Sequence, residues 1–135
     1  MSIRFDEKVV IVTGAGGGLG REHALEFARR GAKVVVNDLG GSVDGSGASD
    51  SANEVVERIK SEGGDAIANG ASVTDLDAVK GMVDKTMKKW GRVDVLVNNA
   101  GILRDKSFHK MSIEDFNLVM SVHFEGTLNC THTVF

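Results

Sequence analysis

The chain of 135 residues contains no tyrosine and no proline, and its only cysteine is Cys130. A single cysteine excludes an intrachain disulfide, and the four scattered histidines add no spacing typical of a metal site. We therefore predict no metal centre. No apolar run approaches the roughly 18 residues that a membrane span requires.

The sequence also lacks a strong charge of either sign. Sixteen Lys and Arg residues against nineteen Asp and Glu residues give a formal net charge of −3, and no basic run could follow a phosphate backbone. The first residues, MSIRFDEK, have no apolar stretch typical of a secretory signal. We expect a cytoplasmic protein that binds neither nucleic acid nor a membrane.

Glycine is abundant, at 17 residues, and two hydrophobic patterns alternate along the chain. Short β-branched runs predict buried strands at 8–13, 33–38, 66–69 and 92–98. Apolar residues at helical spacing predict helices over 20–30, 50–62, 74–90 and from 112 to about the chain end. A segment rich in glycine and serine predicts a loop at 40–49.

Helix caps and faces are also suggested by spacing. Thr74 with Asp77, and Ser112 with Asp115, are typical of N-terminal helix caps. The last helix is expected to carry one inward face, formed by Ile113, Phe116, Val119, Met120, His123 and Thr127.

Alternating strands and helices imply parallel strands joined by right-handed crossovers. We predict an α/β fold, a Rossmann-type doubly wound sheet of four βα units in the strand order 3-2-1-4. The whole chain, 1–135, is then one dinucleotide-binding domain. Strands one and four lie on either side of the point where the winding reverses, so a ligand crevice is expected beyond their carboxyl ends.

The first strand leads directly into a glycine-rich turn, TGAGGGLG, and then into a helix. Gly14 would allow the tight turn, Gly18 would let the backbone approach a pyrophosphate, and Gly20 would allow close helix packing. The spacing is TGxxxGxG, which is neither GxGxxG nor a P-loop with its GK[ST] ending. The alternative interpretation is a flexible turn without a ligand.

Asp38 ends the second strand, where a carboxylate can accept hydrogen bonds from both hydroxyls of an adenosine ribose. An anion there favours NAD over NADP. A turn or capping aspartate is the alternative. For Arg21, at the start of the first helix, contact with phosphate oxygens and a solvated side chain remain equally open.

The fourth strand ends in NNAG, Asn98 to Gly101. Together with TGxxxGxG, this motif makes the whole chain resemble the short-chain dehydrogenase/reductase family. The runs VNDLGG (36–41), GREHA (20–24) and NNAGILRD (98–105) resemble more narrowly the 3-hydroxyacyl-CoA dehydrogenase part of type 2 multifunctional β-oxidation enzymes and their bacterial relatives.

This resemblance implies hydride transfer between a nicotinamide cofactor and an alcohol or ketone, with a 3-hydroxyacyl thioester as a candidate substrate. It places Gly14, Gly18, Leu19 and Gly20 at the cofactor phosphates, Asp38 at the ribose, and Asn99, Ala100 and Gly101 at the nicotinamide side. Ser72-Val73 stands where many relatives carry Asp-Val against the adenine. His123 stands where the family places an Asn that supports proton transfer; a core histidine is the alternative.

The family's catalytic Ser, Tyr and Lys cannot be assigned in this chain, which has no tyrosine. We expect the cofactor-binding half of a dehydrogenase that ends before the catalytic segment and is inactive alone. Its last helix would expose Phe116, Met120 and Phe124, which favours a homo-oligomer. A non-catalytic NAD-binding module is the alternative function, and NNAG argues against a third possibility, an S-adenosylmethionine methyltransferase.

Overall fold

The computed structural model describes residues 2–39 and 50–135, so the expected loop at 40–49 lies outside the described residues. Strands and helices alternate in the predicted order. The strands are β1 (Val9–Val12), β2 (Lys33–Asn37), β3 (Asp65–Asn69) and β4 (Val95–Val97). The helices are α1 (Gly18–Arg29), α2 (Asp50–Ser61), α3 (Leu76–Trp90), α4 (Ile113–Met120) and α5 (Gly126–Val134), with a 3-10 turn η1 (Phe108–Lys110) and a π-helical turn η2 (Ser121–Glu125).

The four strands form one parallel sheet in the order β3-β2-β1-β4, which confirms the predicted fold class and strand order. In the register of the sheet, Val10 of β1 lies between Val34 of β2 and Val95 of β4. Every residue of β1 is buried. A strand covered on both faces has no solvent side, which explains why β1 is an uninterrupted apolar run.

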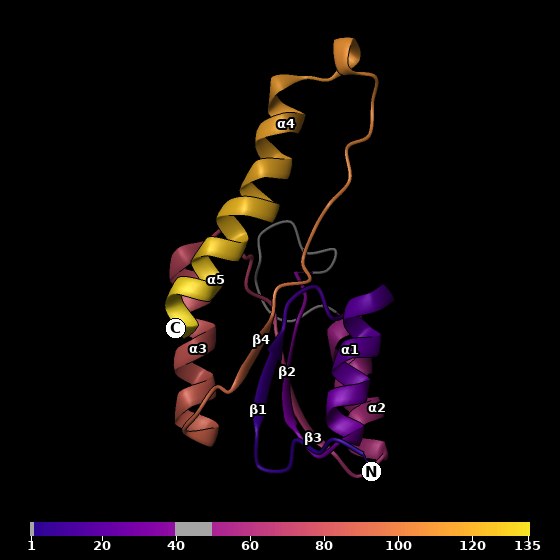
Figure 1. The fold of residues 1–135 in the computed structure, drawn as a ribbon, viewed down its shortest axis with the longest axis vertical. Coiled ribbons are helices and arrows are strands. Elements are labelled where there is room, and N and C mark those ends of the chain that lie inside the picture. The colour runs from indigo at the N-terminus through magenta and orange to yellow at the C-terminus, as the bar shows by residue number, and fades with distance from the viewer. Residues whose placement is uncertain (1, 40–49) are drawn as a thin grey trace.

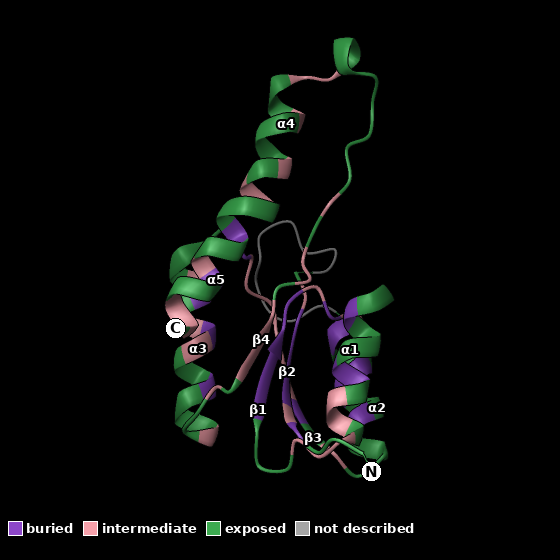
Figure 2. Cartoon of the chain, viewed as in Figure 1, coloured by how far each residue is buried: buried purple, intermediate pink, exposed green. Residues whose placement is uncertain are grey.

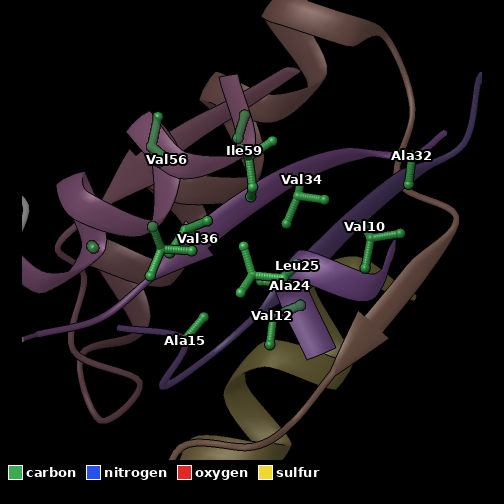
Figure 3. Packing of buried hydrophobic residues seen from close by; sticks show 13 residues of the cluster. Val10, Val12, Ala15, Ala24, Leu25, Ala32, Val34, Val36, Val56 and Ile59 are labelled. Atoms are coloured by element: carbon green, nitrogen blue, oxygen red, sulfur yellow. The ribbon is translucent and has the colours of Figure 1, made fainter. Parts of the chain in front are cut away.

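Helices cover both faces of the sheet: α1 and α2 lie on one face, and α3 and α5 on the other (Figure 1). On the first face, Leu25 of α1 and Ile59 of α2 pack with Val34 (Figure 3). On the second face, Ile11 packs with Met82 of α3. Neighbouring residues of each strand therefore pack into two separate cores, because successive side chains point to opposite faces of the sheet.

Two predicted boundaries are corrected. The N-cap of α3 is Asp75, whose side chain accepts from the Ala78 N–H at 3.1 Å, while the Thr74 hydroxyl lies 2.7 Å from that of Ser72. The strand expected at 92–98 is shortened to β4, and just before it the Asp94 carboxylate accepts from the Val9 N–H at 2.8 Å. The Ser112 cap is confirmed by its hydrogen bond from the Asp115 N–H.

We define the projecting segment as residues 102–120, comprising the strap from Ile102 to Ser112 and α4. It extends beyond the carboxyl edge of the sheet and is mostly exposed (Figures 1 and 2). The inward face predicted for the last helix is wrong, since Ile113 is 66% and Phe116 46% exposed. No described part of the chain supplies a layer that covers them. The expected exposure of Phe116, Met120 and Phe124 is confirmed.

None of the described helices, α4 and α5 included, combines the length and the apolar character needed to cross a bilayer.

Candidate dinucleotide site

The loop from β1 to α1 turns at Gly14 and Gly18, whose φ angles are +64° and +55°. Residues with a side chain rarely adopt this left-handed backbone. A Cβ on Gly14 would also lie 2.9 Å from the Cα of Ala100. The N-cap of α1 is Gly17, which has no side chain to accept from the N–H groups of the first turn. The first turn of α1 contains no acidic residue. An uncapped helix N-terminus of this kind suits an anionic group.

Gly20 and Thr13 hold this loop against the end of β4. A Cβ on Gly20 would collide with the Gly14 carbonyl and the Asn99 side chain, which supports the close packing predicted there. The buried Thr13 hydroxyl accepts from the N–H groups of Asn99 at 3.1 Å and Ala100 at 3.0 Å. The Asn99 amide donates to the Gly14 carbonyl at 3.1 Å. The sequence had suggested no role for Thr13, although it opens the TGxxxGxG motif.

Asp38 directly follows β2 and is half-buried beside the glycine-rich loop. Its Oδ2 accepts a hydrogen bond from the Gly16 N–H at 2.8 Å. A Cβ on Gly16 would lie 2.8 Å from the Asp38 carboxyl carbon, so this glycine is needed for the contact. The carboxylate thus lies at the carboxyl end of the sheet, where the sequence predicted it.

A cavity of about 250 Å³ lies among these segments. It brings together six of the residues predicted for cofactor binding, namely Gly14, Asp38, Ser72, Val73, Ala100 and Gly101. Its other lining residues are Asn37, Leu39, Ala71, Ile102 and Val122. The remaining predicted residues lie outside the lining: Gly20 and Asn99 behind the loop, and Gly18, Leu19 and Arg21 on the first turn of α1.

The first turn of α1 is open to solvent at two of these positions. Leu19 is 75% exposed. The half-exposed Arg21 side chain lies 3.6 Å from Glu22, a weak surface pair that leaves the guanidinium solvated in the described structure.

Asparagine side chains hold the segment that follows β3, a feature that the sequence prediction missed. The buried Asn37 amide donates to the Asn69 side chain and to the Ala71 carbonyl, both at 3.0 Å. Asn129 of α5 donates to the Val73 carbonyl at 2.9 Å. A polar residue within the apolar run VVVN was the available signal for Asn37; no comparable signal marked Asn129.

His123 lies in the π-helical turn η2, and its ring is exposed, so the interpretation as a core histidine is wrong. Its Nε2 is 2.9 Å from the carbonyl oxygen and 3.1 Å from the nitrogen of Ile102. A Cβ on Gly101 would lie 2.6 Å from the His123 ring. The histidine therefore contacts the backbone directly after NNAG, beside the nicotinamide side of the predicted site.

A second cavity, of about 400 Å³, lies between the strap and α4. Ile102, Leu103, Met111, Phe116 and Val119 form its apolar lining, and Arg104, Asp105, Lys106, Asp115 and His123 complete it. Lys106 bridges to Asp115 at 3.2 Å and lowers the pKa of that carboxyl. The strap is thus fastened to α4 by an ion pair.

No reactive thiol accompanies these cavities in the part of the chain that the structure describes. Cys130 is buried, and burial raises the pKa of its thiol to about 11, which keeps it protonated near neutral pH. Within residues 2–39 and 50–135, no three His, Cys, Asp or Glu side chains gather as a metal site.

The fold and the site together define a doubly wound α/β protein with a glycine-rich loop and an acidic second-strand end at its switch point. A family model described as short chain dehydrogenase matches residues 8–135. The chain belongs to the short-chain dehydrogenase family, a family of oxidoreductases.

Three relatives illustrate the similarity. The chain is 54% identical to the peroxisomal multifunctional enzyme type 2 of Drosophila melanogaster and 58% identical to the peroxisomal multifunctional enzyme A of Dictyostelium discoideum. These matches cover 98% and 93% of this chain but 22% and 28% of those proteins. A solved short chain dehydrogenase from Mycobacterium avium matches with a TM-score of 0.90 and 48% identity, over 96% of this chain and 45% of that one.

Proposed function

We propose that this chain is the NAD-binding part of an oxidoreductase that transfers a hydride between nicotinamide and an alcohol or ketone. The observation that carries the proposal is the Asp38 carboxylate held 2.8 Å from Gly16 beside the cavity. The glycine-rich loop suits a dinucleotide, since it packs tightly on the protein at Gly14, Gly16 and Gly20 while a Cβ on Gly17 or Gly18 would face open space, where a ligand could approach the backbone. Bound NAD would supply the hydride acceptor.

Each part of the site would hold a different part of the cofactor. The N–H groups of the first turn of α1, near Gly18 and Leu19, would face the phosphates, with Arg21 close by. Asp38 would accept hydrogen bonds from the adenosine ribose and repel a 2′-phosphate, which favours NAD over NADP. Ser72-Val73 would meet the adenine, and Asn99 to Gly101 would lie at the nicotinamide side.

His123 is proposed to support proton transfer at that side through its contact with Ile102. The acid-base step itself cannot be assigned to a tyrosine of this chain, because it contains none. The resemblance to multifunctional enzymes favours a 3-hydroxyacyl thioester as the substrate. The apolar cavity between the strap and α4 has the chemistry to take an acyl group.

The absence of tyrosine from these 135 residues also favours a second candidate, an NAD-binding module without catalysis. The encoded reading frame separates the two, since only the oxidoreductase requires a Ser and a YxxxK segment after Phe135. An assay with NADH and 3-oxoacyl thioesters or simple ketones tests the chain itself. We expect binding without turnover from the chain alone. Turnover would place the acid-base group within these residues and exclude the non-catalytic module.

We also propose that the chain associates with a second copy. The exposed face of α4, η2 and α5 carries Phe116, Phe124 and Leu128, and apolar side chains grouped on a surface favour contact with another molecule. A cytoplasmic location stays a prediction. The two relatives above are named as peroxisomal, so immunofluorescence of the native protein against peroxisomal and cytosolic markers decides between the compartments.

The test of cofactor choice compares dissociation constants for NADH and NADPH in the unmutated chain and in Asp38→Ala. We expect NADH to bind more tightly, and the variant to lose discrimination worth about 1.5–3 kcal/mol, as for hydrogen bonds to a charged group. Asp65→Ala, an exposed carboxylate at the opposite end of the sheet, is the control and should keep the preference. Equal or tighter NADPH binding by the unmutated chain contradicts the proposal.

A further inference from the structure

The lining of the 250 Å³ cavity comes from different parts of the chain. Ala71, Ser72 and Val73 form one wall, and Val122 of η2 lies in the lining with them. This wall is irregular backbone between β3 and α3, so neither a strand ladder nor a helix fixes its position. Its position depends on the side chains that hold it.

Asn37 holds the inner end of this wall. Its amide donates to the Ala71 carbonyl, and Asn69, its partner, accepts from the Ala71 N–H at 2.9 Å. The backbone of Asn37 also reaches the opposite side of the site, since its carbonyl accepts from the Ala15 N–H at 2.8 Å. One residue of β2 therefore ties both the glycine-rich loop and residues 71–73 to the sheet.

Asn129 holds the outer end of the wall from α5. Its hydrogen bond to the Val73 carbonyl is accompanied by close packing one helical turn earlier, where a Cβ on Gly126 would lie 2.6 Å from a Val73 methyl group. Val122 precedes Gly126 by another turn on the same continuous helix. Asn129 and Gly126 together hold Val73 against the helix that carries Val122.

We propose that Asn129 and Asn37 are positioning residues for the adenine end of the cofactor, an inference that rests on the NAD-binding function proposed above. An adenine ring needs an apolar surface to lie on, and Val73 and Val122 supply apolar side chains to the lining of the cavity that also contains Asp38. The nicotinamide side of the site depends on Asn99 to Gly101, which Thr13 holds instead. Loss of either amide should therefore weaken contact with the adenine more than contact with the nicotinamide.

The test uses three variants. Asn129→Asp keeps the shape but turns an oxygen toward the Val73 carbonyl, and Asn129→Leu and Asn37→Ala remove the donor. Titration calorimetry measures NAD⁺ affinity, and we expect about a tenfold loss for Asn129→Asp from an unpaired, repelled carbonyl. Thr133→Val, which removes a 2.7 Å hydrogen bond to the Asn129 carbonyl in the same helix, is the matched control and should bind within about twofold of the unmutated chain.

Saturation-transfer NMR of NAD⁺ separates positioning from a general loss of structure, because one ligand reports both ends. We expect the adenine proton signals to fall relative to the nicotinamide signals in the Asn129 and Asn37 variants, with circular dichroism unchanged. An equal fall at both ends, unchanged affinity, or unfolding of all three variants overturns the positioning role. Failure of the unmutated chain to bind NAD⁺ overturns the proposed function itself, and the positioning role with it.

Discussion

Two helices of this chain, α2 and α4, carry apolar residues at the same helical spacing, but those of α2 are buried and those of α4 are exposed. In α2, Val55, Val56 and Ile59 are at most 5% exposed, because they pack on the sheet. In α4, Ile113 and Phe116 are 66% and 46% exposed, because the helix projects beyond the sheet edge. Spacing thus predicts a helix and its apolar face, whereas the presence of a covering layer depends on where the helix lies.

Removing the same side chain from each helix gives the largest expected contrast. Ile59→Ala should lower the free energy of unfolding by about 2–5 kcal/mol, because it leaves a cavity against Val34 and Val36. Ile113→Ala, the matched control, should change it by less than about 0.5 kcal/mol. Urea unfolding followed by circular dichroism measures both. A cost at Ile113 close to that at Ile59 would show that another molecule buries α4.

The carboxylate that joins β4 to β1 should have the next largest effect. Asp94 accepts from Val9 and pairs with Arg92 at 2.6 Å, with its side chain 20% exposed. Asp94→Asn should cost about 1.5–3 kcal/mol of the free energy of unfolding, as for hydrogen bonds to a charged group. The measurement is urea unfolding, with Asp84→Asn on the exposed side of α3 as the control.

The same carboxyl gives a pH dependence with a defined sign. Arg92 and the Val9 N–H lower the pKa of Asp94 in the folded state. Its contribution is therefore complete above the unfolded pKa of about 4 and is lost as the pH falls through the lower folded value. The stability of the unmutated chain should fall more steeply below pH 4 than that of Asp94→Asn. Parallel curves would contradict this assignment.

The glycine-rich loop should separate stability from binding. Gly18 has φ +55°, and a Cβ there would meet nothing within 4 Å. Gly18→Val should therefore cost only about 1–2 kcal/mol of backbone strain while placing a side chain where the phosphates would lie. We expect NADH binding to be abolished in calorimetry with the circular dichroism spectrum retained. Unchanged affinity would mean that the loop is only a turn.

The smallest effect on stability is expected at the exposed face itself. Phe124 is 66% exposed in η2, so Phe124→Ser should change the free energy of unfolding of the single chain by less than about 0.5 kcal/mol. It should nevertheless weaken self-association, which light scattering measures, whereas Asn117→Ser on α4 should not. A chain that is monomeric without any substitution would refute the proposed association.

The sequence predicted the parts of the site that depend on local chemistry. Gly14 was predicted to allow a tight turn, and its φ of +64° confirms a turn that favours glycine. The approach of a pyrophosphate to Gly18 stays a prediction. Asp38 was placed correctly because it directly follows a buried strand. Asn129 was missed because it lies 56 residues from Val73 in the chain, and no local pattern reports a contact at that separation.

What the sequence alone determined is the order of elements, the parallel sheet and the location of the crevice, since apolar period and right-handed crossovers leave few alternatives. Only the tertiary structure decided the length of β4 and the contact of His123 with Ile102. It also decided that α4 stays uncovered among the described residues. Each of these features depends on contacts between residues that are far apart in the sequence. The local pattern of residues determines which helix or strand a segment forms, but not which other segment packs against it.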